Sequence, residues 1–157
     1  MCIDANTTVR CTGRNSAGQL GQGVASDPNV DPYVAKSVVA QRYHSAPLTG
    51  VVSLAAGDFL TCALTSGGKM ICWGAVAPNS LNGINTISPT EKGNLSARVT
   101  SIVCGWNHSC VLVADGSIEC WGSNQFGQLG LGHLAAINTG GPNPPSTSVI
   151  GGAVFWK

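Results

Sequence analysis

One stretch of this chain occurs three times along its length. Residues 99–130, VTSIVCGWNHSCVLVADGSIECWGSNQFGQLG, are echoed by residues 51–74, VVSLAAGDFLTCALTSGGKMICWG, and more faintly by residues 2–21, CIDANTTVRCTGRNSAGQLG. Self-similarity at a fixed period is typical of repeat proteins, in which each unit buries its apolar face only against its neighbours. The repetition therefore predicts a scaffold that binds other molecules.

The spacing of the anchor residues sets the boundaries of the units. The interval from Cys72 to Cys120 recurs between Trp73 and Trp121, whereas the interval from Cys11 to Cys72 is longer. The extra residues fall in 24–50, where Asp, Pro and Asn cluster as they do in surface loops. We expect a single repeat domain with these parts: the end of a first unit at 1–23, a loop-rich insert at 24–50, a second unit at 51–98, a third unit at 99–146 and the opening strand of a further or complementing unit at 147–157.

The local sequence predicts short β-strands joined by tight turns. Residues 61–65 and 70–73 are apolar and β-branched runs on either side of Ser-Gly-Gly, and residues 111–113 and 117–120 flank the Asp-Gly pair at 115–116. Asp-Gly between such runs is a strong hairpin signal. No window has a sustained helical period, and the 21 glycines and 8 prolines interrupt the chain too often for long helices. We therefore expect an all-β fold, and units of about 50 residues fit the blades of a β-propeller.

The third unit carries a more specific pattern. An apolar strand is followed by Gly105-x-x-His108-x-Cys110, then by Asp-Gly, and then by Cys-Trp-Gly-x-Asn-x-x-Gly-Gln-Leu-Gly at 120–130. This pattern resembles the repeat family of the regulator of chromosome condensation, in its Cys-Trp-Gly variant. The first unit echoes the pattern, whereas the second departs from it and reads AVAPNSLNG after Gly74.

The resemblance implies a propeller of four-stranded antiparallel blades, most often seven, that binds partners. About three such repeats would form a partial propeller, completed by another copy or by missing blades. Members of the family include guanine-nucleotide exchange factors, enzyme inhibitors and receptor ectodomains, and the Cys-Trp-Gly variant most resembles the extracellular members. Fold alone does not choose among these functions.

Six of the seven cysteines form a regular pattern. Two pairs are ten residues apart and one pair is nine apart, each across a proposed hairpin, where directly opposed residues lie within disulfide distance. We interpret them as cross-strand disulfides, which indicate an oxidising compartment. The alternative is that they are small buried side chains in reduced form. The disulfide candidates are Cys2, Cys11, Cys62, Cys72, Cys110 and Cys120, and Cys104 is left over on an inner strand.

Other repeated residues are interpreted as packing between blades. This set comprises Trp73, Trp121, Gly74, Gly122, Gly127, Gln128, Leu129 and Gly130. Three blades of ordinary twist cannot close a ring, so an apolar face would be left open at each end. Our hypothesis is that residues 148–156 pair with the head of another copy, which gives a ring or a filament. The proposed assembly interface comprises Val149, Ile150, Val154, Phe155 and Trp156.

Composition and motifs exclude several classes of function. Only 10% of residues are charged and the net charge is +1, so there is no basic surface for nucleic acid. No apolar run is long enough to span a membrane, and no signal peptide is present. His108 aligns with Leu60 and is expected to be structural, and no cysteine–histidine spacing fits a metal site. We expect no catalytic residue, metal or cofactor, and aromatic residues at 6% give a carbohydrate partner little support.

These observations predict a non-enzymatic extracellular module that is secreted or on the cell surface. It would bind proteins or join copies of itself head to tail through propeller blades. Asn6 and Asn94 begin glycosylation sequons that suit this location. The alternative is a fragment of an intracellular regulator, either a guanine-nucleotide exchange factor or an enzyme inhibitor, that acts through one propeller face.

Overall fold

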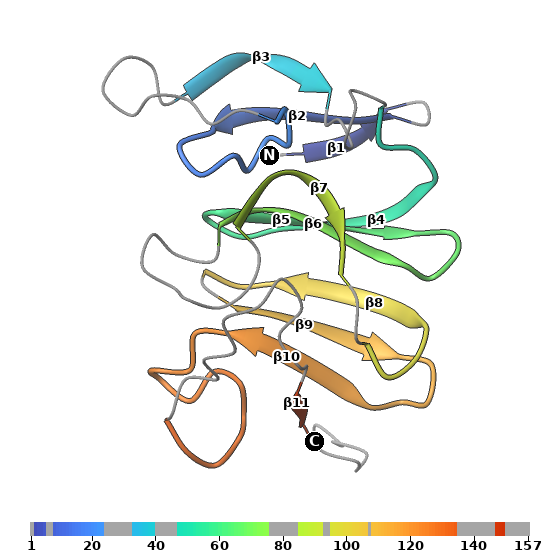
Figure 1. Cartoon of the computed structure of the whole chain (residues 1–157), viewed down its shortest axis with the longest axis vertical. Coiled ribbons are helices and arrows are strands. Elements are labelled where there is room, and N and C mark those ends of the chain that lie inside the picture. The colour runs from blue at the N-terminus through green and yellow to red at the C-terminus, as the bar shows by residue number, and fades with distance from the viewer. Residues whose placement is uncertain are drawn as a thin grey trace, which may run out of the picture.

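Three antiparallel sheets stack one upon another in the computed structural model of the chain (Figure 1). The structure describes residues 2–5, 8–23, 33–39, 47–75, 85–92, 95–106, 108–134 and 147–149. Every regular element in these segments is a β-strand, as the sequence predicts. No helix within these segments has the length and apolarity needed to cross a lipid bilayer.

The sheets follow one another in chain order. The first has the order β1-β2-β3, the second β4-β5-β6-β7, and the third β11-β10-β9-β8, with antiparallel pairing throughout. The strands are β1 (Cys2–Ala5), β2 (Thr8–Arg14), β3 (Tyr33–Val39), β4 (Val51–Ala56), β5 (Leu60–Thr65), β6 (Met70–Ala75), β7 (Asn85–Glu91), β8 (Val99–Cys104), β9 (His108–Val113), β10 (Ile118–Gly122) and β11 (Thr147–Val149).

The central hairpins form because their turns satisfy the backbone locally. Between β9 and β10, the Asp115 carboxylate accepts hydrogen bonds from the backbone N–H and the hydroxyl of Ser117, at 2.9 and 2.7 Å. These bonds lower the pKa of Asp115. Between β5 and β6, the Thr65 hydroxyl oxygen accepts from the N–H of Lys69 at 3.1 Å. Each turn also has a glycine with positive φ, which is accessible to glycine at little cost.

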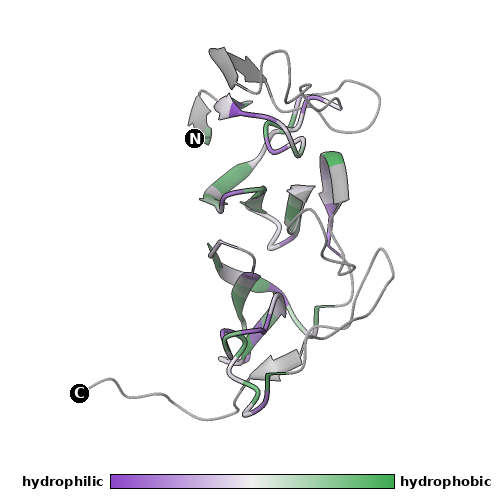
Figure 2. Cartoon of the chain, turned by 90° about the vertical axis from the view of Figure 1, so that its left-hand side faces the viewer, coloured by the Kyte–Doolittle hydropathy of each residue, from purple (hydrophilic) through white to green (hydrophobic). Residues whose placement is uncertain are grey.

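Two apolar cores lie between the sheets. The first core, between the first and second sheets, is made by Val9, Cys11, Leu20, Leu48, Val51, Ala63, Ile71 and Trp73. The second core, between the second and third sheets, is made by Leu60, Cys62, Leu64, Met70, Cys72, Val99, Ile102, Val111, Val113 and Trp121. Alternate residues of β5 and β6 thus serve opposite cores, because successive side chains of a strand point to opposite faces. Figure 2 shows apolar segments on each of the three sheets.

Two parts of the sequence-based division need correction. The insert at 24–50 contains β3, which pairs with β2 as the last strand of the first sheet. The assignment of 147–157 as an opening strand is wrong for its first three residues, because β11 pairs with β10 as the last strand of the third sheet. Both segments are β-branched runs that suit a first or a last strand equally, so residue type could not decide their place. Ile150, Val154, Phe155, Trp156, Asn6 and Asn94 lie outside the described residues.

A substitution at Gly74 tests the tight approach of β5 to β6. Gly74 has φ of 100°, and a Cβ there would clash with the carbonyl oxygen of Phe59, whereas a Cβ at Gly116 (φ 88°) would meet nothing within 4 Å. We expect Gly74→Ala to lower the free energy of unfolding by about 3 kcal/mol and Gly116→Ala by about 1 kcal/mol. Urea unfolding of the two variants measures the difference. Equal losses would contradict the close approach.

Candidate functional site

A disulfide joins two adjacent strands in every sheet: β1 and β2, β5 and β6, and β9 and β10. Cys62 lies directly opposite Cys72 in the second sheet, and the equivalent pairs Cys2–Cys11 and Cys110–Cys120 occupy the same place in the other two. Each pair is a disulfide with a Cα–Cα distance of 4.1 Å. The repeat thus carries the same cross-link in each of its three sheets.

Cys104 is the one cysteine without a disulfide. It ends β8, is partly buried, and accepts a hydrogen bond from the Ser109 hydroxyl at 3.4 Å. Burial raises the pKa of the Cys104 thiol, which disfavours the reactive thiolate. The geometry indicates a structural role for this residue.

The first Gly-Gln-Leu-Gly turn connects the first unit to the second sheet. We call residues 15–21 the first latch turn. The backbone carbonyl of Gln19 accepts hydrogen bonds from the indole N–H of Trp73 at 2.9 Å and from the hydroxyl of Thr61 at 3.0 Å. The side-chain amide of Gln19 donates to the carbonyl of Asp58 at 3.1 Å. Trp73 is fully buried in the first core, and this one turn holds the second sheet through three hydrogen bonds.

The turn at 124–130, the second latch turn, has the same internal structure. The Asn124 side-chain oxygen accepts from the N–H of Leu129 at 3.0 Å, and Gln128 Oε1 accepts from the N–H of Phe126 at 2.9 Å. In the first latch turn the matching bonds, to Asn15 and Gln19, measure 3.0 and 2.8 Å. Among the described residues, none donates to the backbone carbonyl of Gln128. The second turn thus has the internal bonds of the first, without a described donor to the carbonyl of its glutamine.

The structure places the other residues of the predicted packing set in or beside these contacts. Leu129, Gly74 and Gly122 are buried, Gly127 and Gln128 are partly buried, and Gly130 is exposed. Trp121 is buried between the second and third sheets. Its indole N–H has no hydrogen-bond partner among the described residues. The sequence gives a reason, since the second unit lacks the Gly-Gln-Leu-Gly turn whose carbonyl would accept that bond.

A buried charged pair near Trp121 was missed in the sequence. Glu119 is fully buried and accepts hydrogen bonds from the backbone N–H and the hydroxyl of Ser96. The ammonium of Lys92 lies 5.5 Å from the centre of the Trp121 ring. Desolvation lowers the pKa of Lys92, and the charge of Glu119 opposes that shift. Aligning the units would have given the signal, because Glu119 occupies the place of the apolar Ile71.

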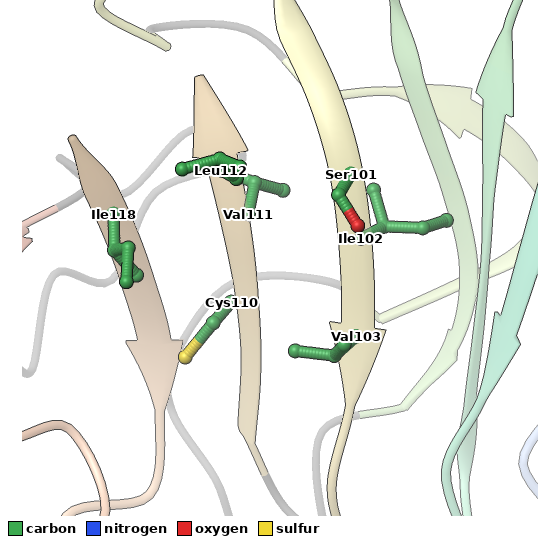
Figure 3. A pocket seen from close by; sticks show the side chains of 7 residues that line it. All are labelled: Ser101, Ile102, Val103, Cys110, Val111, Leu112 and Ile118. Carbon is green, nitrogen blue, oxygen red and sulfur yellow. The ribbon is translucent and has the colours of Figure 1, made fainter. Parts of the chain in front are cut away.

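One face of the third sheet is open. Val103, Leu112 and Ile118 are 60%, 40% and 37% exposed, and with Cys110 they line a shallow hollow of about 330 Å³ (Figure 3). Ile102 points the other way, toward the second sheet (Figure 3). This open face carries apolar side chains and the Cys110–Cys120 disulfide, and none of the described residues that line the hollow is charged. Such a surface favours apolar contact with another protein.

His108 lies on the third sheet next to Gly105. A Cβ at Gly105 would clash with the imidazole, so the ring packs against the glycine backbone. Desolvation lowers the pKa of His108. No cluster of metal-ligating side chains occurs among the residues the structure describes. This arrangement suits a packing role for His108.

Comparison with known proteins agrees with this geometry. The family model of the regulator of chromosome condensation (RCC1) repeat matches residues 51–75 and 99–128. These two segments carry RCC1 repeats. The matched segments contain the disulfide hairpins of the second and third sheets, and the second segment extends into the second latch turn.

Two curated relatives align with most of the chain. The ultraviolet-B receptor UVR8 of Arabidopsis thaliana is 29% identical over 138 residues, which are 85% of this chain and 29% of the relative. The probable E3 ubiquitin-protein ligase HERC4 of Rattus norvegicus is 27% identical over 135 residues, or 83% of this chain and 12% of the relative. The chain therefore spans less than a third of the length of either relative.

Solved structures share the fold. Human WBSCR16 superposes with a TM-score of 0.70 at 20% identity, over 94% of this chain and 36% of that one. Yeast RCC1 (Prp20), in its complex with Kap60, superposes with a TM-score of 0.65 at 19% identity, over 88% of this chain and 32% of that one. The three sheets are therefore propeller blades of the RCC1 type in a partial propeller.

The contact between the first latch turn and Trp73 can be tested with a matched pair of variants. Trp73→Phe removes the hydrogen bond to Gln19 while keeping a ring, and Trp121→Phe removes an N–H without a partner among the described residues. We expect Trp73→Phe to cost about 1 kcal/mol more stability than Trp121→Phe, because it also leaves a buried carbonyl with one donor fewer. Urea unfolding measures both. An equal loss of unfolding free energy in both variants would show that the hydrogen bond from Trp73 to Gln19 does not stabilise the fold.

His108 makes stability depend on pH. Its pKa is lower in the folded chain than the ordinary 6.5, so the unfolded chain binds the proton more readily. Stability is then fully present above about pH 6.5 and decreases as the pH falls through the folded pKa. We expect His108→Leu, which copies Leu60 of the second unit, to reduce this decrease in unfolding free energy between pH 7 and pH 5. His133→Leu, in an exposed turn, serves as the control.

Proposed function

We propose that this chain is a non-enzymatic, extracellular protein-binding module built of RCC1-type propeller blades. The observation that carries the proposal is the disulfide repeated at one position in all three sheets. Such bonds form and persist in oxidising compartments and are rare where glutathione keeps thiols reduced. Because the pair recurs in all three units, we interpret it as a disulfide and not as two small buried thiols. The proposed location is therefore outside the cell or on its surface.

Protein binding is supported by the open face and by the family. The open face of the third sheet is apolar and the described residues of its hollow are uncharged, which suits a protein partner better than nucleic acid or a charged metabolite. One solved relative, Prp20p of Saccharomyces cerevisiae, is described with its binding properties to Gsp1p and histones. That protein is an example of an RCC1 propeller whose partners are proteins. We extend only this class of partner to the present chain.

The sequence suggested that copies join head to tail because residues 147–157 would form the opening strand of a unit in another copy. Residues 147–149 already pair with β10 in their own sheet, so they do not open a unit in another copy. Light scattering at increasing concentration remains the direct measurement of self-association. A ring or a filament would give a defined or a growing mass, respectively.

The location is tested by counting free thiols in the protein isolated from its natural source under non-reducing conditions. We expect alkylation and mass spectrometry to label Cys104 alone, and all seven cysteines after reduction and unfolding. Reduction should also lower the free energy of unfolding by about 2 to 4 kcal/mol per disulfide. Free thiols at Cys62, Cys72, Cys110 and Cys120 would instead favour the intracellular regulator.

A further inference from the structure

The two joints between neighbouring sheets differ in chemistry at one equivalent place. When the second and third units are aligned on their disulfides, Ser96 and Glu119 occupy the places of Leu48 and Ile71. Leu48 and Ile71 are apolar and buried in the first core, so they serve the joint between the first and second sheets. At the joint between the second and third sheets, the same two places carry a hydroxyl and a carboxylate. The two joints therefore depend on different forces.

The carboxylate of Glu119 is buried beneath the connection that leads into the third sheet. Glu119 lies on β10 and is 0% exposed. Its Oε1 atom accepts hydrogen bonds from the backbone N–H of Ser96, at 2.8 Å, and from the Ser96 hydroxyl. Ser96 belongs to residues 95–98, which we call the strap, and is itself exposed. The strap thus separates a buried charge from solvent by a single layer of residues.

A lysine reaches the same joint from the second sheet. Lys92 directly follows β7 and is 5% exposed, and its backbone N–H donates to the carbonyl of Met70 at 2.8 Å. Its ammonium lies 5.5 Å from the centre of the Trp121 ring. Desolvation lowers the pKa of Lys92, and the negative charge of Glu119 opposes that shift. Burying this ammonium is therefore unfavourable, and the charge of Glu119 reduces the cost.

The other charged groups on the elements around this joint make their contacts elsewhere. Lys69 and Glu91 form an exposed ion pair at 3.0 Å, and Arg98 donates to the carbonyl of Ser66. The carboxylate of the β9–β10 turn binds within its own turn. His108 lies on the side of β9 away from the second core, because it alternates with the residues of β9 that belong to that core. Lys92 is therefore the counter-charge of Glu119 at this joint.

We propose that Glu119 and Lys92 form an acid-sensitive catch that holds the third sheet on the second sheet. While the carboxylate is ionised, it binds the strap and balances the ammonium. Protonation removes the balancing charge and leaves the ammonium buried against Trp121, which is unfavourable. The stabilising effect of the catch is thus present at neutral pH and is lost as the pH falls. The strap and the third sheet then open locally, whereas the joint between the first and second sheets stays closed.

Glu119→Gln tests the catch at constant pH. The amide keeps an oxygen that can accept from Ser96 and removes only the charge. At pH 7 we expect the backbone amides of β9 and β10 to exchange hydrogen at least about tenfold faster in this variant, and those of β2 to be unchanged. Glu91→Gln is the matched control, because it neutralises an exposed glutamate next to Lys92 in the chain, and it should change neither rate.

Removing the lysine separates the effect of charge from the effect of packing. Lys92→Met keeps a long apolar side chain beside Trp121 and removes the ammonium. In the chain with both Glu119→Gln and Lys92→Met, we expect exchange of the third sheet to return to within about threefold of the unsubstituted rate, because no buried charge is left without its counter-charge. If Glu119→Gln alone does not fold, Lys92→Met should restore folding.

The response to acid is measured in a chain that carries His108→Leu, because His108 also makes the third sheet sensitive to acid. Hydrogen exchange is followed from pH 7 to about pH 4 and corrected for the chemical exchange rate at each pH. We expect the amides of β9 and β10 to lose protection relative to those of β2 as the pH falls. Adding Glu119→Gln and Lys92→Met together should abolish this loss.

Four results would overturn the proposal. Exchange of the third sheet in Glu119→Gln that matches Glu91→Gln would show that the charge of Glu119 does not hold the joint. Equal acceleration in β2 would show that the whole fold is weakened and that no local opening occurs. Failure of Lys92→Met to restore protection or folding would exclude the buried ammonium as the cause. An acid response that persists without both charges would exclude protonation of Glu119 as the trigger.

Discussion

The second sheet of this protein is covered on both faces, and that arrangement governs the rest of the structure. Strand alternation sends Cys62 and Met70 toward one neighbour and Ala63 and Ile71 toward the other. A sheet of this kind cannot be stable alone, because half of its apolar surface would remain in water. The stack in Figure 1 is therefore the unit of stability, and the third sheet carries exposed apolar side chains on one face.

The first latch turn fixes the position of the second sheet relative to the first. Hydrophobic contact alone tolerates sliding and rotation between sheets, whereas the bonds from Trp73 and Thr61 to one carbonyl fix where the second sheet sits. The contact between the second and third sheets uses other means. Lys92 lies near the Trp121 ring, and the carboxylate of Glu119 binds Ser96. A repeat can thus lose its characteristic turn and still hold its neighbour through charged groups.

The sequence alone predicted the hairpins, which depend on local turn residues, and the equivalence of the second and third units, which depends on the repeat spacing. The Asp-Gly and Ser-Gly-Gly turns determine the central hairpins, and the constant interval between the second and third units places equivalent strands in equivalent sheets. The outer strands β3 and β11 were harder, because each lies far along the chain from the strand it pairs with. The Pro- and Asn-containing stretches before them indicate loops but do not determine which strand becomes the partner. The acceptor role of Gln19 was also invisible, since it belongs to a backbone carbonyl that every residue has. Glu119 was missed as well, although it occupies the place of the apolar Ile71 in the aligned units.

The placement of the disulfides has a consequence for their chemistry. Cys62 and Cys72 are fully buried between sheets, while Cys110 lies partly exposed on the uncovered side of the third sheet. Thiol–disulfide exchange requires an attacking thiolate to reach a sulfur atom, so access controls its rate. A mild reductant would then open the Cys110–Cys120 bond early and reach the Cys62–Cys72 bond only when the sheets separate. A molecule bound on the uncovered side would block this access, so the rate at which the Cys110–Cys120 bond is reduced reports whether that side is covered.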